Sequence, residues 1–236
     1  MIILGIETAT AVCGAVIMDG DTILSEHEIA EPHVHSEHLL SIINRCLEST
    51  VGSLQAVDAI AISIGPGSFT GLRIGLSVVK GLSFAAGKKI VAVPTLHALA
   101  WRAVVEKYVG ENDYILPMID ARRDEVYTAM YQYRSQSLQE CFAPCAKSLS
   151  ELSNDIAGID HIVILGDGTP KFRKLFHGDE NSQMSRYIIP SEEHRYCKAS
   201  AVAAVARANT GLYTINDIAA LEPFYIKDFY TVSKQR

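Results

Sequence analysis

The sequence lacks a long hydrophobic run and a leader-like N-terminus. None of its segments reaches the roughly 18 to 20 consecutive apolar residues that a transmembrane helix requires. The apolar run at Met1–Glu7 is interrupted early and follows no basic segment, so it does not resemble a signal peptide. These features predict a cytoplasmic protein that makes no membrane contact.

The sequence also lacks an excess of positive charge and a paired set of cysteines. Its formal net charge is −6, the opposite sign from a protein that holds nucleic acid through many phosphate contacts. If the protein works on RNA, another component must supply the positive groove. Its five cysteines are odd in number and scattered, which favours reduced thiols, and no His or second Cys pair beside Cys141 and Cys145 completes a zinc site.

The composition that remains is typical of an α/β protein. With 236 residues, 48% of them hydrophobic, the chain is long enough for one large domain or for two lobes of about 100 residues each. Two β-type runs at 2–7 and 12–18, a turn signal at Asp19–Asp21 and a third run from Thr22 predict an antiparallel meander.

An amphipathic helix is predicted to begin at Ser36 and to end near Glu48. Ser36 can accept hydrogen bonds from free amides, and Glu37 suits the positive end of a helix. The apolar residues of this segment recur at intervals of three and four, and they are Leu39, Leu40, Ile43, Cys46 and Leu47.

The next segments predict a parallel crossover followed by a second lobe. A strand at 58–64, a helix from about Ser68 to Ala86 and a strand at 90–93 follow one another, which implies parallel strands. After a third helix over 96–109, the pattern restarts with strands at 114–119, 126–133 and 161–165 and a helix at 199–208. We therefore expect two lobes, 1–110 and 111–236.

The turn at Gly65–Gly67 joins a buried strand to a helix. Glycines at such a turn permit a positive φ and close backbone approach, and free amides at the helix start favour an anion. Gly65, Gly67 and Ser68 are therefore candidates for an anion site, although no Gly-Lys-Ser/Thr follows to make a P-loop.

Glycines at 71, 75 and 81 make one face of this second helix small. Each interior glycine costs about 1 kcal/mol relative to alanine, so a packing reason is expected, either the lobe's own sheet or another subunit. Together with the five apolar residues of the first helix, the predicted partner surface comprises Phe69, Thr70, Leu72, Arg73, Gly75, Leu76 and Lys80.

Several short motifs occur in an order that resembles the bacterial TsaB (YeaZ) family over nearly the whole chain. They are Ile6–Thr10, His35–Glu37, Gly65–Gly75 with Lys80–Leu82, Pro94–Leu96, Asp120–Arg123 with Glu125–Tyr127, Gly166–Gly168 and Pro223–Lys227. Each motif is weak alone, but the ordered combination is specific.

This resemblance implies a two-lobed, actin-like ATPase (ASKHA, ribonuclease H-like) fold with mixed sheets flanked by helices and a reduced second lobe. It further implies a non-catalytic scaffold beside a catalytic TsaD-type paralogue and a TsaE-type ATPase. That machinery transfers a threonylcarbamoyl group to adenosine 37 of tRNAs that read codons beginning with A. The tRNA would be reached through the complex, and a homodimer is expected when the chain is alone.

Compared with the catalytic paralogue that it resembles, the sequence lacks an acidic pair and two metal-binding histidines. Ala11 and Val12 stand where that relative carries an Asp-Glu pair, and Thr95 and Leu99 stand where it carries two metal-binding histidines. Neither Thr nor Leu replaces an imidazole ligand, and His97 lies between them without a partner. We therefore assign no catalytic residue, no metal and no cofactor.

Several alternatives remain open from the sequence. Glu7 stands where related kinases carry an Asp, so Glu7, Thr8 and Thr10 with Gly65, Gly67 and Ser68 could keep a residual ADP or ATP site, in the inter-lobe cleft or at the partner interface. An autonomous ATPase or a glycoprotease-like metallopeptidase is the functional alternative. His33, His35 and His38 could hold a metal or lie in a solvated loop, and Arg122 with Arg123 could bind an anion or form local ion pairs.

Overall fold

The computed structural model describes residues 1–31, 35–174, 186–192 and 195–227. The first lobe contains β1 (Ile2–Glu7), β2 (Cys13–Asp19), β3 (Thr22–Ile29), α1 (His35–Glu48), β4 (Ala59–Ser63), α2 (Phe69–Ala86) and β5 (Lys89–Val93), with a short 3-10 helix at Leu54–Ala56. The elements that follow are α3 (Thr95–Val105), β6 (Tyr114–Asp120), β7 (Glu125–Arg134), β8 (Ser137–Ser148), α4 (Leu149–Asp155), β9 (Ile162–Leu165), α5 (Thr169–Lys174), β10 (Tyr187–Ile188), α6 (Ala199–Ala208) and α7 (Thr210–Tyr213).

The two sheets repeat one topology. The first has the order β3-β2-β1-β4-β5 and the second has the order β8-β7-β6-β9-β10. In each sheet the first three strands of the chain are antiparallel, and the last two run parallel to the first. This duplicated mixed sheet confirms the predicted two-lobed ASKHA-type fold, and the two-residue β10 and shorter outer helices fit a reduced second lobe.

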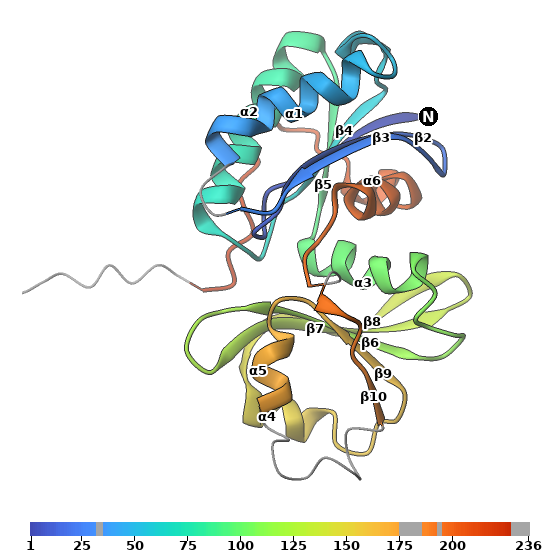
Figure 1. Cartoon of the computed structure of the whole chain (residues 1–236), viewed down its shortest axis with the longest axis vertical. Helices are drawn as coiled ribbons and strands as arrows, with labels where there is room; N and C mark the ends of the chain where they lie inside the picture. The colour runs from blue at the N-terminus through green and yellow to red at the C-terminus, as the bar shows by residue number, and fades with distance from the viewer. Residues whose placement is uncertain (32–34, 175–185, 193–194, 228–236) are drawn as a thin grey trace, which may run out of the picture.

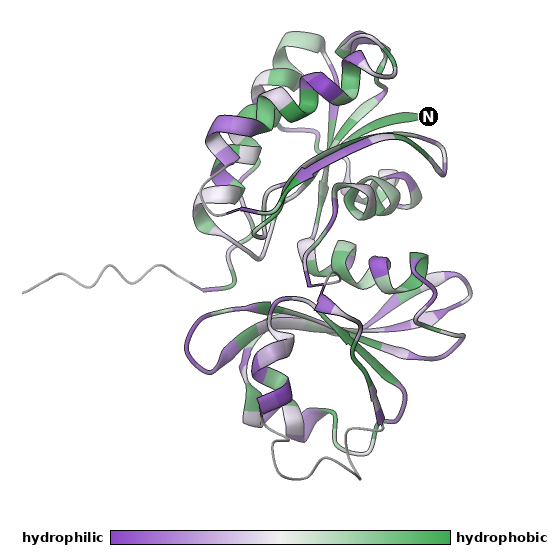
Figure 2. Cartoon of the chain, viewed as in Figure 1, coloured by the Kyte–Doolittle hydropathy of each residue, from purple (hydrophilic) through white to green (hydrophobic). Residues whose placement is uncertain are grey.

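Helices cover both faces of each sheet, so the molecule is built in layers (Figure 1). Helices α1 and α2 cover the outer face of the first sheet, and α4 and α5 lie on the outer face of the second. Helices α6 and α3 pack against each other between the two sheets. Along α1, hydrophobic and hydrophilic stretches alternate, as expected for an amphipathic surface helix (Figure 2).

The chain does not divide at residue 110 as expected from the sequence. Helix α3 packs its buried side chains, including Leu96 and Leu99, on the second sheet, whereas α6 packs on the first sheet against Ile3 and Val16. Each helix between the sheets therefore belongs to the lobe opposite to the one that its place in the sequence suggested.

Two acidic residues of β3 explain where α6 begins. The backbone amide of Ser200 donates to the Glu26 carboxylate at 2.8 Å, and that of Ala199 donates to Glu28 at 3.4 Å. Carboxylates at a helix N-terminus satisfy otherwise free amides and interact favourably with the helix dipole. The returning chain is thus fixed to the first lobe by side chains that lie about 170 residues earlier.

Candidate functional site

The loop after β1 folds its own carboxylate inward. Oε1 of Glu7 accepts hydrogen bonds from the amides of Ala9 (2.7 Å) and Thr10 (2.9 Å) and from the Thr10 hydroxyl (3.2 Å). Glu7 is fully buried, and Oε2 has no hydrogen-bond partner in the described part of the chain. Burial raises the pKa of Glu7 because the charged form loses its hydration. The side chain shapes its own loop instead of facing the cleft.

The start of α2 is closed by the same loop. The amide of Ser68 donates to the carbonyl of Ala9 at 2.6 Å, and the Ser68 hydroxyl caps the helix by accepting from Gly71 at 3.2 Å. A Cβ atom at Gly67 would lie 2.2 Å from the Ala9 carbonyl oxygen, so glycine allows this close contact. Ser68 was predicted to donate hydrogen bonds to an anion. Its amide and its hydroxyl instead form hydrogen bonds within the lobe.

Thr95 and Leu99 both lie in the packed interior. The Thr95 hydroxyl accepts from the amide of Gly65 at 2.9 Å, and the Thr95 amide donates to the Gly65 carbonyl at 2.8 Å. Leu99 is fully buried against the second sheet. His97 stacks on Tyr131, bonds the Tyr213 hydroxyl at 2.8 Å, and has its pKa lowered to about 4 by burial. Thr95 therefore links α3 to the turn of the first lobe, and Leu99 belongs to the core of the second lobe.

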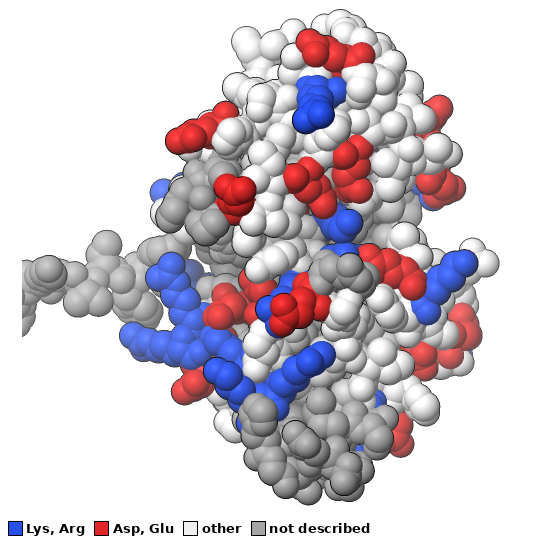
Figure 3. All heavy atoms as spheres, in the orientation of Figure 1, with Lys and Arg blue, Asp and Glu red and all other residues white. Residues whose placement is uncertain are grey.

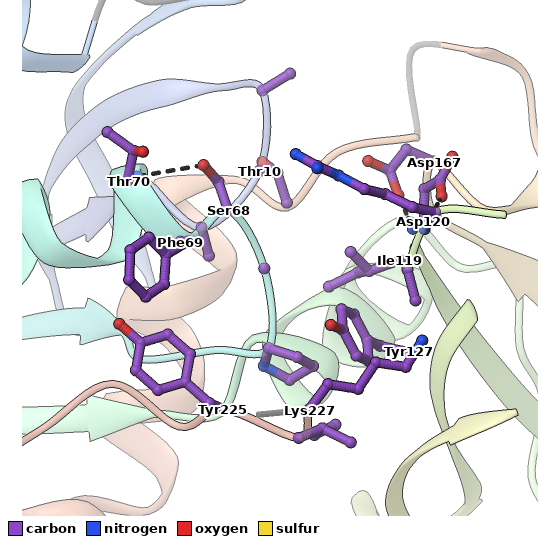
Figure 4. A pocket seen from close by; sticks show the side chains of 18 of the residues that line it. Thr10, Ser68, Phe69, Thr70, Ile119, Asp120, Tyr127, Asp167, Tyr225 and Lys227 are labelled. Carbon is purple, nitrogen blue, oxygen red and sulfur yellow. Dashed lines mark hydrogen bonds between the residues drawn. The ribbon is translucent and has the colours of Figure 1, made fainter. Parts of the chain in front are cut away.

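A cleft of about 1230 Å³ separates the loop after β1 and the start of α2 from the β6–β7 turn. Figure 4 shows Phe69 and Tyr225 on one wall and Asp120 with Asp167 on the opposite wall. Asp167 accepts from the amide of Asp120 at 2.8 Å, and its pKa is raised to about 6 by burial and the Asp120 charge. Lys and Arg side chains gather on the second lobe beside this junction (Figure 3).

The basic residues of the β6–β7 turn remain available to a ligand. Arg122 and Arg123 line the cleft, and both have positive φ, 65° and 50°. Lys171 reaches into this turn, pairing with Asp120 at 2.5 Å and donating to the Arg123 carbonyl. The guanidinium groups themselves form no ion pair with a described carboxylate, so the predicted local pairing of the two arginines is not what holds the turn.

Most of the predicted partner surface is interior to the chain. Leu39, Ile43, Cys46, Leu47 and Leu76 are buried in the core between α1, α2 and the first sheet, and Leu72 is buried as well. Gly75 faces Thr8 within the same lobe. Periodicity identified this buried face correctly, but the lobe's own sheet covers it, which is the alternative that the sequence left open.

The outward face of these helices carries a different set of residues. Leu40 is 58% exposed and Phe84, which the sequence reading missed, is 91% exposed, while Thr70 and Arg73 are also exposed. Helix α2 is apolar and long enough to cross a membrane by length and composition, and 33% of it is buried inside the protein. The outward side of α2 carries apolar residues that are exposed or half-buried. A helix that docks on a protein partner presents the same kind of surface.

The histidines considered as metal ligands do not form a metal site within the described residues. His35 is buried and its Nε2 contacts the carbonyl oxygen of Val12 at 3.1 Å, and His33 lies outside the described residues. Cys197 is buried beside Glu7, and burial followed by the Glu7 carboxyl raises the pKa of its thiol. Within the described ranges, no three His, Cys, Asp or Glu side chains are grouped so as to hold a metal ion.

A family model described as TsaD, tRNA N6-adenosine threonylcarbamoyltransferase, matches residues 23–230. The chain belongs to this family. Within it, the chain is a TsaB (YeaZ) member, as the motif order indicated.

Two named relatives are described as proteins of one RNA-modification pathway. The chain is 36% identical over 135 residues to the tRNA threonylcarbamoyladenosine biosynthesis protein TsaB of Escherichia coli, covering 56% of this chain and 55% of that protein. It is 33% identical over 140 residues to the Bacillus subtilis protein of the same name, covering 59% of each. These matches span little more than half the length of each relative.

A solved structure supports the relationship over the whole fold. YeaZ from Pseudomonas aeruginosa superposes with a TM-score of 0.77 and 26% identity, covering 95% of this chain and 100% of that one. The two-lobed architecture is therefore that of the TsaB (YeaZ) members of the family.

Proposed function

We propose that this chain is a non-catalytic subunit for threonylcarbamoyl transfer to adenosine 37 of tRNAs that read codons beginning with A. It would act in the cytosol with a TsaD-type catalytic subunit and a TsaE-type ATPase, and tRNA would be bound through the complex. Alone, it would pair with a second copy of itself.

The observation that carries the non-catalytic assignment is the orientation of Glu7. In this lobe Glu7 is the acidic residue at the position where related kinases bind phosphate and metal, and it points into the core. The amides of Ala9 and Thr10 both donate to its carboxyl group, and the amide of Ser68, at the start of α2, donates to the Ala9 carbonyl of the same loop. A carboxyl group in this setting stabilises a loop and is not positioned to coordinate a cleft-bound cation.

The observation that supports a scaffold role is the outer face of α1 and α2. Phe84 is almost fully exposed and Leu40 is more than half exposed, and both lie on helices of the first lobe. Exposed apolar side chains on adjacent helices gain free energy when a partner helix covers them. We place the contact with the catalytic subunit on this face.

Reconstitution of the transfer reaction tests this proposal. Purified TsaD-type and TsaE-type proteins are incubated with ATP, threonylcarbamoyl-adenylate and unmodified tRNA, with and without this chain. We expect modified adenosine only when the chain is present, and we expect the Glu7→Gln variant to support the reaction as the wild type does. A reaction that proceeds equally without the chain refutes the proposal.

A regulatory nucleotide site is the second candidate, and the cleft favours it. Its volume of about 1230 Å³ suits a phosphate-bearing ligand, as do the guanidinium groups of Arg122 and Arg123, which form no ion pair with a carboxylate in the described ranges. Titration with ADP and with ATP, for the chain alone and with the catalytic subunit, separates binding from turnover. Robust ATP hydrolysis by the chain alone would instead support the autonomous ATPase.

A further inference from the structure

The turn between β6 and β7 is fixed by its carboxylates and its backbone. The amide of Arg122 donates to the Asp120 carboxylate at 2.6 Å, and the amide of Glu125 donates to the Arg122 carbonyl at 3.3 Å. Nζ of Lys171, on α5, pairs with the same carboxylate and donates to the Arg123 carbonyl at 2.6 Å. The backbone of the turn is therefore held in place without the guanidinium groups of the two arginines.

The positive charge of this turn continues along α5. Lys174 follows Lys171 by three residues, so the two side chains are neighbours on one face of the helix. Arg173 points elsewhere, because its guanidinium group donates to the Ile189 carbonyl at 3.4 Å. Figure 3 shows Lys and Arg side chains gathered on the second lobe beside the junction of the lobes. The basic patch, as we call it, consists of Arg122, Arg123, Lys171 and Lys174.

Most of the positive charge of the basic patch is uncompensated. Lys171 pairs with Asp120, whereas the two arginines and Lys174 are exposed and form no ion pair with a described carboxylate. The exposed Asp124 of the turn has no cation partner in the described ranges either, and it opposes this charge only in part. The patch is therefore a local excess of positive charge on a chain whose formal net charge is −6.

The basic patch extends beyond the cleft between the lobes. Both arginines line the cleft, but Lys171 and Lys174 are not among its lining residues. A nucleotide held in the cleft would leave the charge of α5 unused. The repeated phosphates of a nucleic-acid backbone can contact the arginines at the edge of the cleft and Lys174 beyond it. Arginine suits such a ligand because its guanidinium group binds phosphate through two hydrogen bonds, and lysine binds phosphate as a point charge.

We infer that the basic patch binds the phosphate backbone of the tRNA that the complex modifies. The inference rests on the proposed function, and it adds that this chain contacts the RNA directly. A patch of four cations on an acidic chain fits a contact of limited length and not a continuous positive groove. Phosphate contacts position a nucleic acid and carry no sequence information, so the patch orients the tRNA and leaves recognition of the adenosine to the catalytic subunit.

Removal of charge from the turn tests this inference. The affinity of the assembled complex for unmodified tRNA is measured at several salt concentrations, with the wild-type chain and with Arg122→Gln/Arg123→Gln. Each lost phosphate contact lowers the slope of log affinity against log salt concentration by about 1. We expect a slope that is smaller by about 1 to 2 and an affinity that is lower by on the order of tenfold.

Lys107→Gln/Arg134→Gln is the matched control. It removes the same charge from two exposed residues of the chain. Arg134 ends the strand that begins beside the turn, so it lies about 30 Å away along β7. The complex that contains this control should bind tRNA with the affinity and the salt slope of the wild type.

Asp124→Asn separates a charge effect from a folding defect. This change removes the unpaired carboxylate beside the two arginines with little change of shape, and the Asp124 carbonyl still accepts from the amide of Leu149. The affinity for tRNA should rise by about twofold to fivefold, as expected for one surface charge. A lower affinity of the folded variant would contradict the inference.

Two further measurements distinguish RNA from the other ligands that a basic patch can bind. The light-scattering mass of each complex reports subunit assembly, and titration with ADP and ATP reports nucleotide binding. If Arg122→Gln/Arg123→Gln weakens assembly or nucleotide binding but leaves the affinity and salt slope for tRNA unchanged, this inference alone is overturned. A wild-type complex that neither binds nor modifies tRNA overturns the proposed function, and this inference with it.

Discussion

A Cβ atom at Gly75 would lie 2.1 Å from Oγ1 of Thr8, so the helix and the loop after β1 meet at a position that only glycine fits. Thr8 is fully buried and β-branched, and it has little room to move away. We expect Gly75→Ala to lower the free energy of unfolding by about 1 to 3 kcal/mol, the usual cost of overpacking.

Gly81 is the matched control for this change. It lies in the same helix, but a Cβ atom there would meet nothing within 4 Å. Gly81→Ala should therefore raise stability by up to about 1 kcal/mol through helix propensity. In urea unfolding, the free energies of the two variants should shift from the wild-type value in opposite directions. A Gly75→Ala protein that is as stable as the wild type would contradict this packing, and bulky residues at Gly75 would test the fold before they test subunit pairing.

Self-association is better tested at Phe84. Because its ring is 91% exposed, Phe84→Glu should leave the free energy of unfolding within about 0.5 kcal/mol of the wild type. It should shift the light-scattering mass from a pair to a single chain. Val105→Glu, at a 60% exposed site on α3, is the control and should not change the mass. If Phe84→Glu still pairs, the outer face of α2 is not the contact.

Asp167 should make stability depend on pH. Its pKa is raised from 3.8 to about 6, so between these values the folded protein retains a proton that the unfolded chain releases. The contribution of Asp167 to stability is therefore present at low pH and is lost as pH rises from about 4 to about 6. Asp167→Asn keeps an oxygen to accept from the Asp120 amide but removes the titration.

Unfolding midpoints of wild type and Asp167→Asn across this pH range give the measurement. The variant should gain stability relative to the wild type as pH rises toward neutral. A constant difference between the two proteins over the range would show that Asp167 does not titrate in this way.

Gly65 should control how the C-terminal segment 219–227 packs on the first lobe. Its φ is 119°, and a Cβ atom there would lie 2.4 Å from the carbonyl oxygen of Phe224. Gly65→Ala should displace the segment 219–227 and make the chain more susceptible to limited proteolysis near that segment. The Gly87→Ala variant, at positive φ with open space, controls for backbone strain alone. Equal cleavage rates for the two variants would contradict the close contact.

Sequence patterns predicted the elements of the first lobe well, because they depend on local signals. The spacing of Leu39, Ile43 and Cys46 identified α1 and its apolar face, and Gly65–Gly67 identified the turn into α2. Which surface covers that face depends on the tertiary structure, and local sequence patterns do not specify it. The periodicity of a helix is the same whether its own sheet or another subunit buries it, so the partner surface was assigned largely to core residues.

The long strand β8 and the exchange of α3 and α6 between lobes also escaped prediction. The sequence of β8 is polar and contains Pro144, which weakens the usual strand signal, although an edge strand tolerates both. The placement of α6 depends on Glu26 and Glu28, which are far from it in sequence. The orientation of Glu7 likewise depends on its loop, and a motif comparison marks the position without showing which way the carboxyl group points.

In the function proposed here, the chain supports threonylcarbamoyladenosine synthesis without contributing a catalytic group. The most direct measurement is the threonylcarbamoyladenosine content of bulk tRNA, by mass spectrometry, after depletion of the chain and complementation with variants. We expect the modification to disappear on depletion and to return with the wild type and with Glu7→Gln, but not with Phe84→Glu. Unchanged modification after depletion, or failure of a folded Glu7→Gln variant to restore it, would contradict the account.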